Sequence, residues 1–260
     1  MDLGLKGKVV VITGGTAGIG KASAEAFLAE GCKVVVCGRS EAKLEAFRAE
    51  FAGRDILTVQ ADVASFDDMQ RLASAAEEAF GGIDVWVNNA GVYPAGDLED
   101  MNMDAWRRTF SVNVDGVLYG CRAAIPAMRR RGGGVILNAG SYAVITPTAN
   151  RGAYAISKAA VHQMTRVLAA ELGPDHIRVV TYNPGFVLTE LNAPQVAEYP
   201  KGAIERQTAQ NRLGRPEEVA GLIVFLASER ASFITGSGVE VSGGKYCVQN
   251  PAMPWERRGI

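Results

Sequence analysis

The sequence predicts an α/β fold, a doubly wound parallel sheet of about seven strands with helices on both faces. Short runs rich in β-branched residues alternate with longer helical patterns along the chain. Almost every position in those runs is apolar, as expected for strands that are buried on both faces. Such alternation gives right-handed crossovers and a parallel sheet. No linker, repeat or change of composition divides the 260 residues, so we expect a single domain over residues 1–260.

The apolar runs predict strands at residues 8–13, 33–37, 56–60, 83–89, 134–139, 177–182 and 238–242. The helical patterns fall near residues 19–30, 41–50, 67–80, 104–130, 152–172 and 216–228. Pro216, followed by two glutamates, is typical of a helix start, and three arginines before Gly132 are typical of a helix end. Two segments depart from the alternation, and we name them here: the lid (190–212) and the tail (245–260).

Charge and composition argue against several classes of protein. The net charge is −1, which gives no reason to expect a nucleic acid or an anionic membrane as a partner. No stretch approaches the roughly 18 consecutive apolar residues of a membrane helix, and the N-terminus resembles a first strand more than a signal peptide. The four cysteines form no CxxC, so reduced core thiols are expected in place of a metal site or disulfides. We expect a soluble, cytoplasmic protein.

A glycine-rich loop follows the first predicted strand directly. The stretch "TGGTAGIG", Thr13 to Gly20, fits T-G-x-x-x-G-x-G and leads into a helix. Glycines at this point let backbone N–H groups approach a pyrophosphate at the helix N-terminus. The alternative is a glycine turn without a ligand, but the context of strand, loop and helix favours a Rossmann dinucleotide-binding fold.

The end of the second strand bears on which dinucleotide is bound. An acid here binds a ribose 2′-hydroxyl, whereas an arginine accommodates a 2′-phosphate. The chain has Gly38 and then Arg39, with no carboxylate. A guanidinium suits a phosphate by charge-assisted hydrogen bonding, so NADP(H) is favoured over NAD(H). The alternative is that Arg39 is a solvated loop residue.

Polar residues follow the next two strands as well. Asp62, in "ADV", is placed to meet the adenine amino group, and "NNAG" (88–91) offers an amide beside the same cleft. The carboxyl ends of parallel strands line one crevice, so these segments should converge. Asn88 and Asn89 could equally serve a structural role by tying neighbouring strands together.

Tyr154 and Lys158 stand one helical turn apart in "YAISK", so their side chains share a face. A nearby ammonium favours the phenolate, and we expect it to move the tyrosine pKa from about 10 toward the working range of an acid–base catalyst. Ser141 ends a strand, where it can donate a hydrogen bond to a substrate oxygen. Asn113 is a poor helix former within a long helical pattern and requires an explanation.

Together these segments resemble the classical short-chain dehydrogenase/reductase family. The resemblance rests on "TGGTAGIG", "ADV", "NNAG", Asn113, Ser141, "YAISK", "NPG" and the late "GRPEEVAGLIVFLAS", and covers almost the whole chain. It implies that Tyr154 is the general acid/base and that Ser141 orients the carbonyl. It further implies that Lys158 lowers the Tyr154 pKa and binds the nicotinamide ribose, while Asn113 holds a water that links Lys158 to solvent.

The resemblance also implies a cofactor site, with the dinucleotide half in residues 1–100 and the catalytic half in 101–189. Pro184 and Gly185 would bound the nicotinamide pocket, while the Val187 backbone and Thr189 would bind its carboxamide. The full expected set is Gly14, Thr16, Ala17, Gly18, Ile19, Gly20, Arg39, Ser40, Asp62, Val63, Asn89, Ala90, Gly91, Tyr154, Lys158, Pro184, Gly185, Val187 and Thr189. The chain departs from the pattern at two places. Thr16 stands beside Ala17 where many NADP-preferring relatives carry a basic residue, and Gly140 before the serine is expected to loosen its loop.

By the same resemblance the substrate is a small carbonyl or alcohol compound with apolar bulk. The expected pocket consists of Tyr93, Ser141, Tyr142, Ala143, Val144, Phe186, Leu188 and Leu191, although core packing explains several of them equally well. The lid would order over the substrate, and the tail, with Trp255, would pack across a subunit boundary or form a disordered end. Family members are usually homotetramers, with a homodimer as the alternative. The expected activity is an NADP(H)-dependent ketone or aldehyde reductase, against an NAD-dependent secondary-alcohol dehydrogenase or a non-catalytic dinucleotide-binding regulator.

Overall fold

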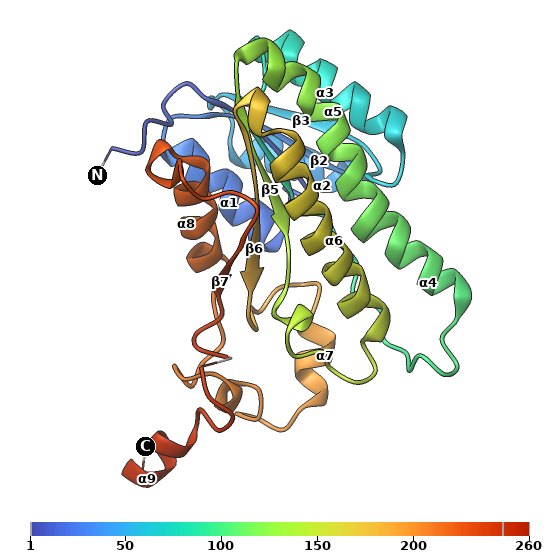
Figure 1. The fold of residues 1–260 in the computed structure, drawn as a ribbon, viewed down its shortest axis with the longest axis vertical. Coiled ribbons are helices and arrows are strands. Elements are labelled where there is room, and N and C mark those ends of the chain that lie inside the picture. Colours follow the sequence, from blue (N-terminus) through green and yellow to red (C-terminus); the bar gives the residue numbers. More distant parts are fainter. Residues whose placement is uncertain (1, 246, 260) are drawn as a thin grey trace.

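The computed structural model describes residues 2–245 and 247–259 and contains one seven-stranded parallel sheet in the order β3-β2-β1-β4-β5-β6-β7 (Figure 1). The strands are β1 (Val9–Thr13), β2 (Lys33–Gly38), β3 (Ile56–Gln60), β4 (Val85–Asn88), β5 (Gly134–Ala139), β6 (Ile177–Pro184) and β7 (Gly238–Val241). Every neighbouring pair is parallel, and the strand order reverses between β1 and β4. The predicted fold class is confirmed.

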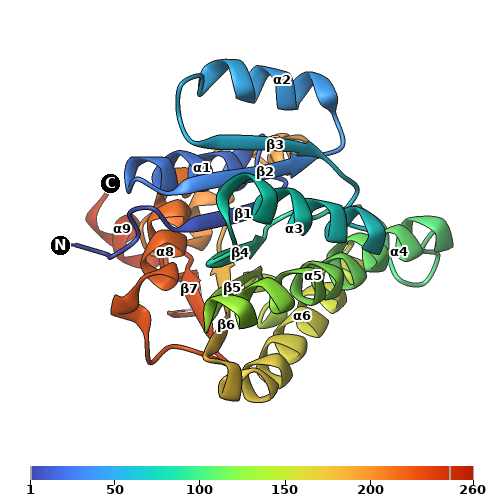
Figure 2. The ribbon, with the colours of Figure 1, turned by 90° about the horizontal axis from the view of Figure 1, so that it is seen from above.

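Helices cover both faces of the sheet (Figure 2). Those on one face pack with a core cluster that includes Val10 and Ile12, and those on the other pack with a cluster that includes Val11. Successive side chains of a strand point to opposite faces, which explains why β1 is buried at every position and apolar at all but Thr13. The helices on the first face are α1 (Gly18–Ala29), α2 (Glu41–Glu50) and α8 (Pro216–Ala227). Those on the second face are α3 (Phe66–Phe80), α5 (Gly116–Arg131) and α6 (Gly152–Glu171). Three further helices lie beyond them: α4 (Met103–Phe110), α7 (Ala193–Glu198) and α9 (Met253–Arg258).

The long helix predicted over 104–130 contains an irregular turn. Between α4 and α5 the backbone follows a π-helical turn from Ser111 to Asp115. Asn113 lies fully buried in this turn, where its amide exchanges hydrogen bonds with both backbone groups of Val92. The poor helix former is therefore explained: its side chain ties the helix to the loop after β4. Single π-helical turns often mark functional sites.

The cysteine expectation holds for three residues and is wrong for the fourth. Cys32, Cys37 and Cys121 are buried, and burial raises the pKa of each thiol to about 12. They are therefore unreactive thiols at neutral pH. Cys247 is exposed because it belongs to the tail, outside the two core clusters. Across the described residues, no helix combines the length and apolar character that crossing a membrane requires.

The lid and the tail lie together beyond the carboxyl end of the sheet (Figure 1). The tail is helical over α9 and packs on its own chain, because Trp255 Nε1 donates to the Ala209 carbonyl of the lid at 2.9 Å. The expectation of a disordered end is therefore wrong for the described part of the tail. Tertiary contact with the lid overrides the weak local signal of a short, proline-flanked segment.

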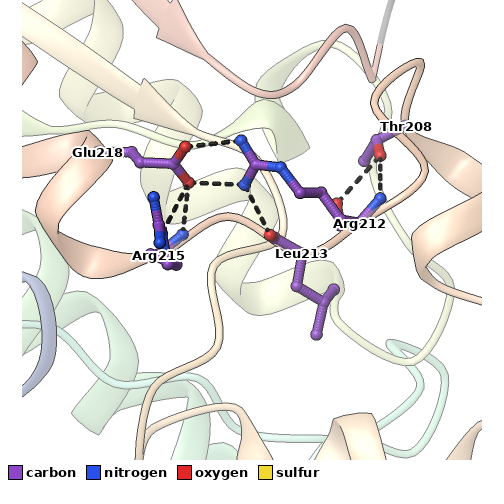
Figure 3. A network of polar contacts seen from close by, with 5 residues as sticks. All are labelled: Thr208, Arg212, Leu213, Arg215 and Glu218. Carbon is purple, nitrogen blue, oxygen red and sulfur yellow. Dashed lines mark hydrogen bonds and ion pairs between the residues drawn. The ribbon is translucent and has the colours of Figure 1, made fainter.

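An ion pair anchors the end of the lid to the start of α8 (Figure 3). Glu218 accepts from the Arg212 guanidinium at 2.6 and 2.8 Å and from the Arg215 backbone N–H at 2.9 Å. Hydrogen bonds from Arg212 and from that N–H lower the pKa of Glu218 to about 2. The carboxylate therefore stays charged throughout the neutral range and serves as the N-terminal cap that the "RPEE" stretch indicated.

Replacing either of two helical glycines by alanine is predicted to change stability, in opposite directions. A Cβ at Gly120 would overlap Asn88 Oδ1 and lie 2.7 Å from Trp86 Nε1, whereas a Cβ at Gly221 would meet nothing within 4 Å. Gly120→Ala should therefore lower the free energy of unfolding by about 1–3 kcal/mol through overpacking. Gly221→Ala should raise it by up to about 1 kcal/mol through helix propensity. Urea denaturation of both variants checks this, and equal effects of the two substitutions would contradict the packing of α5 on β4.

Candidate active site

A cavity of about 320 Å³ opens at the carboxyl ends of the central strands, where the strand order reverses. Ligands of doubly wound sheets bind at this kind of position. Its walls are the glycine loop, the segment after β4, the Ser141 loop, the first turns of α6 and residues 184–187 and 189–192. The predicted cofactor residues that line it are Gly14, Ala17, Gly18, Ile19, Asn89, Ala90, Gly91, Tyr154, Lys158, Pro184, Gly185, Val187 and Thr189.

The glycine loop is shaped for close backbone approach. Gly14 and Gly18 adopt φ of +65° and +50°, in the region that disfavours other residues. A Cβ at Gly20 would overlap the Gly14 carbonyl. The helix α1 that follows has Ala17 at its N-cap, no side-chain cap and no acid in its first turn. Its first N–H groups are therefore available to an anion, and this cradle fits the pyrophosphate of a dinucleotide.

The two asparagines after β4 have different surroundings. Asn88 is buried, donates to Asn138 Oδ1 at 2.8 Å and accepts from Trp86 Nε1, so for it the structural alternative is correct. Asn89 donates to the carbonyls of Thr13 and Gly14 and also lines the cavity. It therefore holds the glycine loop while facing the cleft.

Tyr154, Ser141 and Lys158 come together on one wall of the cavity. Lys158 is buried, and its Nζ donates to the Ala139 carbonyl at 2.8 Å while lying 5.6 Å from the centre of the Tyr154 ring. Tyr93 packs edge-on against the same ring, with the ring centres 4.6 Å apart. The predicted pair thus shares one face of α6, and Ser141 reaches it from the end of β5.

The pKa of Tyr154 differs from the expectation. Burial raises the pKa of Tyr154, and a hydrogen bond with Ser141 lowers it by a smaller amount. The resulting pKa is about 12. Burial also lowers the pKa of Lys158 to about 8. The predicted shift of the tyrosine toward neutrality is therefore wrong for the chain on its own, because loss of hydration outweighs the ammonium 5.6 Å from its ring.

Asn113 is connected to α6 through Ser157, a residue that the sequence analysis did not single out. Asn113 Nδ2 donates to Ser157 Oγ at 3.1 Å, and Ser157 Oγ donates to the Tyr154 carbonyl at 2.7 Å. With both amide donors engaged, one lone pair of Asn113 Oδ1 remains for the expected water. The signal for Ser157 was its place inside "YAISK", between the two residues of the pair.

Comparison with known proteins agrees with this geometry. A family model described as enoyl-(acyl carrier protein) reductase matches residues 14–245. The chain is 42% identical over 245 residues to a 3beta-hydroxysteroid dehydrogenase 1 of Eggerthella lenta, covering 92% of this chain and 94% of the relative. It is 38% identical over 254 residues to a trans-4-hydroxycyclohexanecarboxylate dehydrogenase of Sinomonas cyclohexanicum, covering 94% of each. A crystal structure of a short-chain type dehydrogenase/reductase from Mycobacterium marinum superposes with a TM-score of 0.89 at 36% identity, covering 94% of this chain and 97% of the other.

The chain belongs to the short-chain dehydrogenase/reductase family. It is an NAD(P)-dependent enzyme that acts on alcohol or carbonyl groups. The non-catalytic regulator considered from the sequence is thereby set aside.

In this dehydrogenase/reductase the adenosine-side residues lie outside the lining of the cavity. Arg39 is exposed, and none of the described residues forms a hydrogen bond or ion pair with its guanidinium. Ser40 caps α2 by accepting from the Lys43 N–H. Asp62 accepts from Arg108, which sequence reasoning missed, at 3.1 Å. The predicted cofactor residues outside the lining are Thr16, Gly20, Arg39, Ser40, Asp62 and Val63.

Part of the predicted substrate pocket lines the same cavity. Tyr93, Ser141, Tyr142, Phe186 and Leu191 line the cavity, as do Glu190 and Asn192, which were not predicted. Three predicted residues, Ala143, Val144 and Leu188, do not line it. Ala143 is buried beside the cavity, Val144 is half-buried, and Leu188 points outward and is exposed.

Gly140 does not loosen the serine loop. Its N–H donates to the Tyr182 carbonyl at 2.9 Å, and a Cβ at this position would overlap Asn183 Oδ1. Asn183 Oδ1 is in turn 2.9 Å from His162 Nε2. The glycine therefore permits close packing of the strand ends that carry Ser141, which corrects the expectation.

The buried ammonium of Lys158 predicts a trade-off between stability and activity. At pH 7 it is charged in both the folded and the unfolded chain, so its burial costs stability. Between its folded pKa of about 8 and the ordinary value of 10.5 the unfolded chain binds more protons, so stability rises with pH over that window. Lys158→Met should therefore be more stable than the parent by about 1–3 kcal/mol at pH 7, with an advantage that shrinks above pH 8. Denaturant titrations at several pH values measure this, and a less stable variant at pH 7 would contradict it.

Proposed function

We propose that the protein is an NADP(H)-dependent oxidoreductase that interconverts a secondary alcohol and a ketone, with Tyr154 as general acid/base. The observation that carries the proposal is that Tyr154, Ser141 and Lys158 line the same cavity as the glycine loop. A nicotinamide ring and the reacting group of a substrate would meet at the wall that these three side chains form. An aldehyde is the alternative carbonyl substrate.

The chemistry assigns one task to each residue. A bound nicotinamide dinucleotide supplies or accepts the hydride. Tyr154 holds the proton at its phenolic oxygen and transfers it to or from the substrate oxygen, which Ser141 orients by a hydrogen bond. Lys158, fixed by the Ala139 carbonyl, supplies positive charge next to the phenol and a donor for the nicotinamide ribose. Asn113 positions the helix through Ser157 and keeps one acceptor for a water.

Selection of NADP(H) is supported by the end of β2. Gly38 offers no carboxylate, and a Cβ there would lie 3.5 Å from Thr16 Oγ1, so the threonine hydroxyl faces this point. Arg39 extends from the same turn without a partner among the described residues and is available to a 2′-phosphate. Asp62 is held for the adenine amino group by Arg108. NAD(H) is the alternative cofactor.

The substrate class follows from the cavity and the relatives. Aromatic and aliphatic side chains of Tyr93, Tyr142, Phe186 and Leu191 surround the catalytic wall, which suits an apolar body. The two relatives described above act, by their names, on a steroid alcohol and on a cyclohexane alcohol. We therefore propose a hydroxyl or oxo group on an alicyclic ring.

Assembly and location are part of the same proposal. Exposed apolar side chains on α6, α8 and the loop after α8 favour an assembly of several copies, which we propose is a homotetramer or a homodimer. These exposed side chains are Ile156, Val167, Phe225 and Phe233. We also propose that the protein is cytoplasmic.

Arg39 should decide the choice of dinucleotide. Arg39→Gln is expected to weaken NADPH binding about 10- to 100-fold, because a charge-assisted pair is lost, while NADH binding changes less than about threefold. Fluorescence titration of both dinucleotides gives the Kd values. Arg166→Gln, at an exposed arginine of α6, is the matched control and should change neither. Tighter binding of NADH than NADPH by the parent protein would overturn the NADP(H) assignment.

Tyr154→Phe should abolish turnover while dinucleotide binding persists. Removal of the proton-transferring group should lower kcat by a factor of about 10² to 10⁴. Steady-state kinetics with cyclohexanol and NADP⁺ measure it. Tyr93→Phe removes a hydroxyl from the same cavity and should change kcat less than about tenfold, because no proton transfer is assigned to it. Residual activity of Tyr154→Phe within tenfold of the parent would exclude Tyr154 as the acid/base.

A further inference from the structure

A second cation lies against two aromatic rings of the substrate cavity, although it lines a neighbouring groove and not the cavity itself, and it has no role in the reaction described above. Lys245 follows the last strand and extends over two aromatic rings of the cavity wall. Its Nζ is 5.4 Å from the centre of the Tyr142 ring and 5.0 Å from that of Phe186. The two rings also contact each other, with centres 4.9 Å apart. Both rings also line the substrate cavity, so Lys245 contacts the cavity wall from the neighbouring groove.

The partners of Lys245 are all neutral. Its ammonium donates to the amide oxygen of Gln207 in the lid, and within the described part of the chain it forms no ion pair. The side chain is half-buried, and this burial lowers the pKa of the ammonium. An ammonium that loses hydration without gaining a carboxylate is costly. Two of its three N–H donors remain available to a ligand.

The space beside Lys245 is open to a ligand. A groove of about 770 Å³ separates the Ser141 loop, the lid and the tail, and its lining includes Lys245, Arg206 and the exposed Glu256. Glu256 is the single carboxylate among the described residues that line it. The Trp255 indole, which donates to the Ala209 carbonyl, holds the tail in place as one wall.

We propose that Lys245 binds a carboxylate carried by the substrate, so that the enzyme prefers alicyclic hydroxy acids and oxo acids over neutral ring alcohols and ketones. This rests on the proposed function for the reacting end of the substrate. The cation–π contacts and Gln207 hold the ammonium in the groove beside the cavity wall, and a carboxylate that extends from the cavity into this groove completes its hydrogen bonding. Lys245 is thus a specificity-determining residue supplied by the segment after β7.

The kinetic test compares an acid with its neutral ester. The substrates are trans-4-hydroxycyclohexanecarboxylate and its methyl ester, each oxidised with NADP⁺. Lys245→Met keeps the apolar stem on the two rings and removes the charge. We expect kcat/KM for the acid to fall about 10- to 100-fold and kcat/KM for the ester to change less than about threefold. Lys201→Met, at an exposed lysine of the lid, is the matched control and should leave the acid-to-ester ratio unchanged.

A binding test separates this inference from the proposed function. Cyclohexanecarboxylate has no hydroxyl group to oxidise, and calorimetry with the NADP⁺-loaded enzyme gives its Kd. Lys245→Met should weaken this binding about 10- to 100-fold. Unchanged binding, or an equal loss of kcat/KM for acid and ester, would overturn the carboxylate site and assign Lys245 a structural role. Lys245-dependent binding without turnover of either compound would support the site and overturn the proposed substrate class.

Discussion

The candidate site depends on the burial of one ammonium group, that of Lys158, without a carboxylate. The charge is held by a backbone carbonyl at 2.8 Å and by the face of the Tyr154 ring, and burial lowers its pKa to about 8. An uncompensated cation in a poorly hydrated wall produces a strong local field, which a neutral or well-paired lysine would not. That field acts on the phenol and on any oxygen brought to it. Burial of this charge lowers the stability of the fold, but it supplies the electrostatic field that the proposed reaction uses.

The surrounding structure serves to keep that cation in position. Strand β5 presents the Ala139 carbonyl, and Gly140 lets β5 and β6 end close together, so that Ser141 reaches the same wall. The π-helical turn places Asn113 against Val92 and Ser157, which ties α6 to the loop after β4. At the far side the lid is anchored by Glu218 and covered by the tail (Figures 1 and 3). Lys245, a second cation whose partners are neutral, lines the groove between the lid and the tail.

The sequence predicted the sheet, the glycine loop and the catalytic group because each depends on local patterns or on spacing along one helix. Ala143, Val144 and Leu188 were misplaced because the direction of a loop side chain depends on packing, which periodicity does not encode. Arg108 and the Ala139 carbonyl were missed because their partners lie 46 and 19 residues away in the chain. The expected lowering of the Tyr154 pKa failed because burial is a tertiary property, and here it outweighs a neighbour one helical turn away. Trp255 was ambiguous for the same reason, since its partner Ala209 lies 46 residues away in the chain.

The most direct test of this account is the ionisation of Tyr154 itself. Its phenol can be followed by carbon NMR of the labelled ring, assigned with Tyr154→Phe, in the protein alone and when saturated with NADP⁺. We predict a pKa near 12 in the protein alone and a lower value with NADP⁺, because the positive nicotinamide ring adds to the field of Lys158. A pKa below 10 in the protein alone, or one unchanged by saturating NADP⁺, would contradict the account.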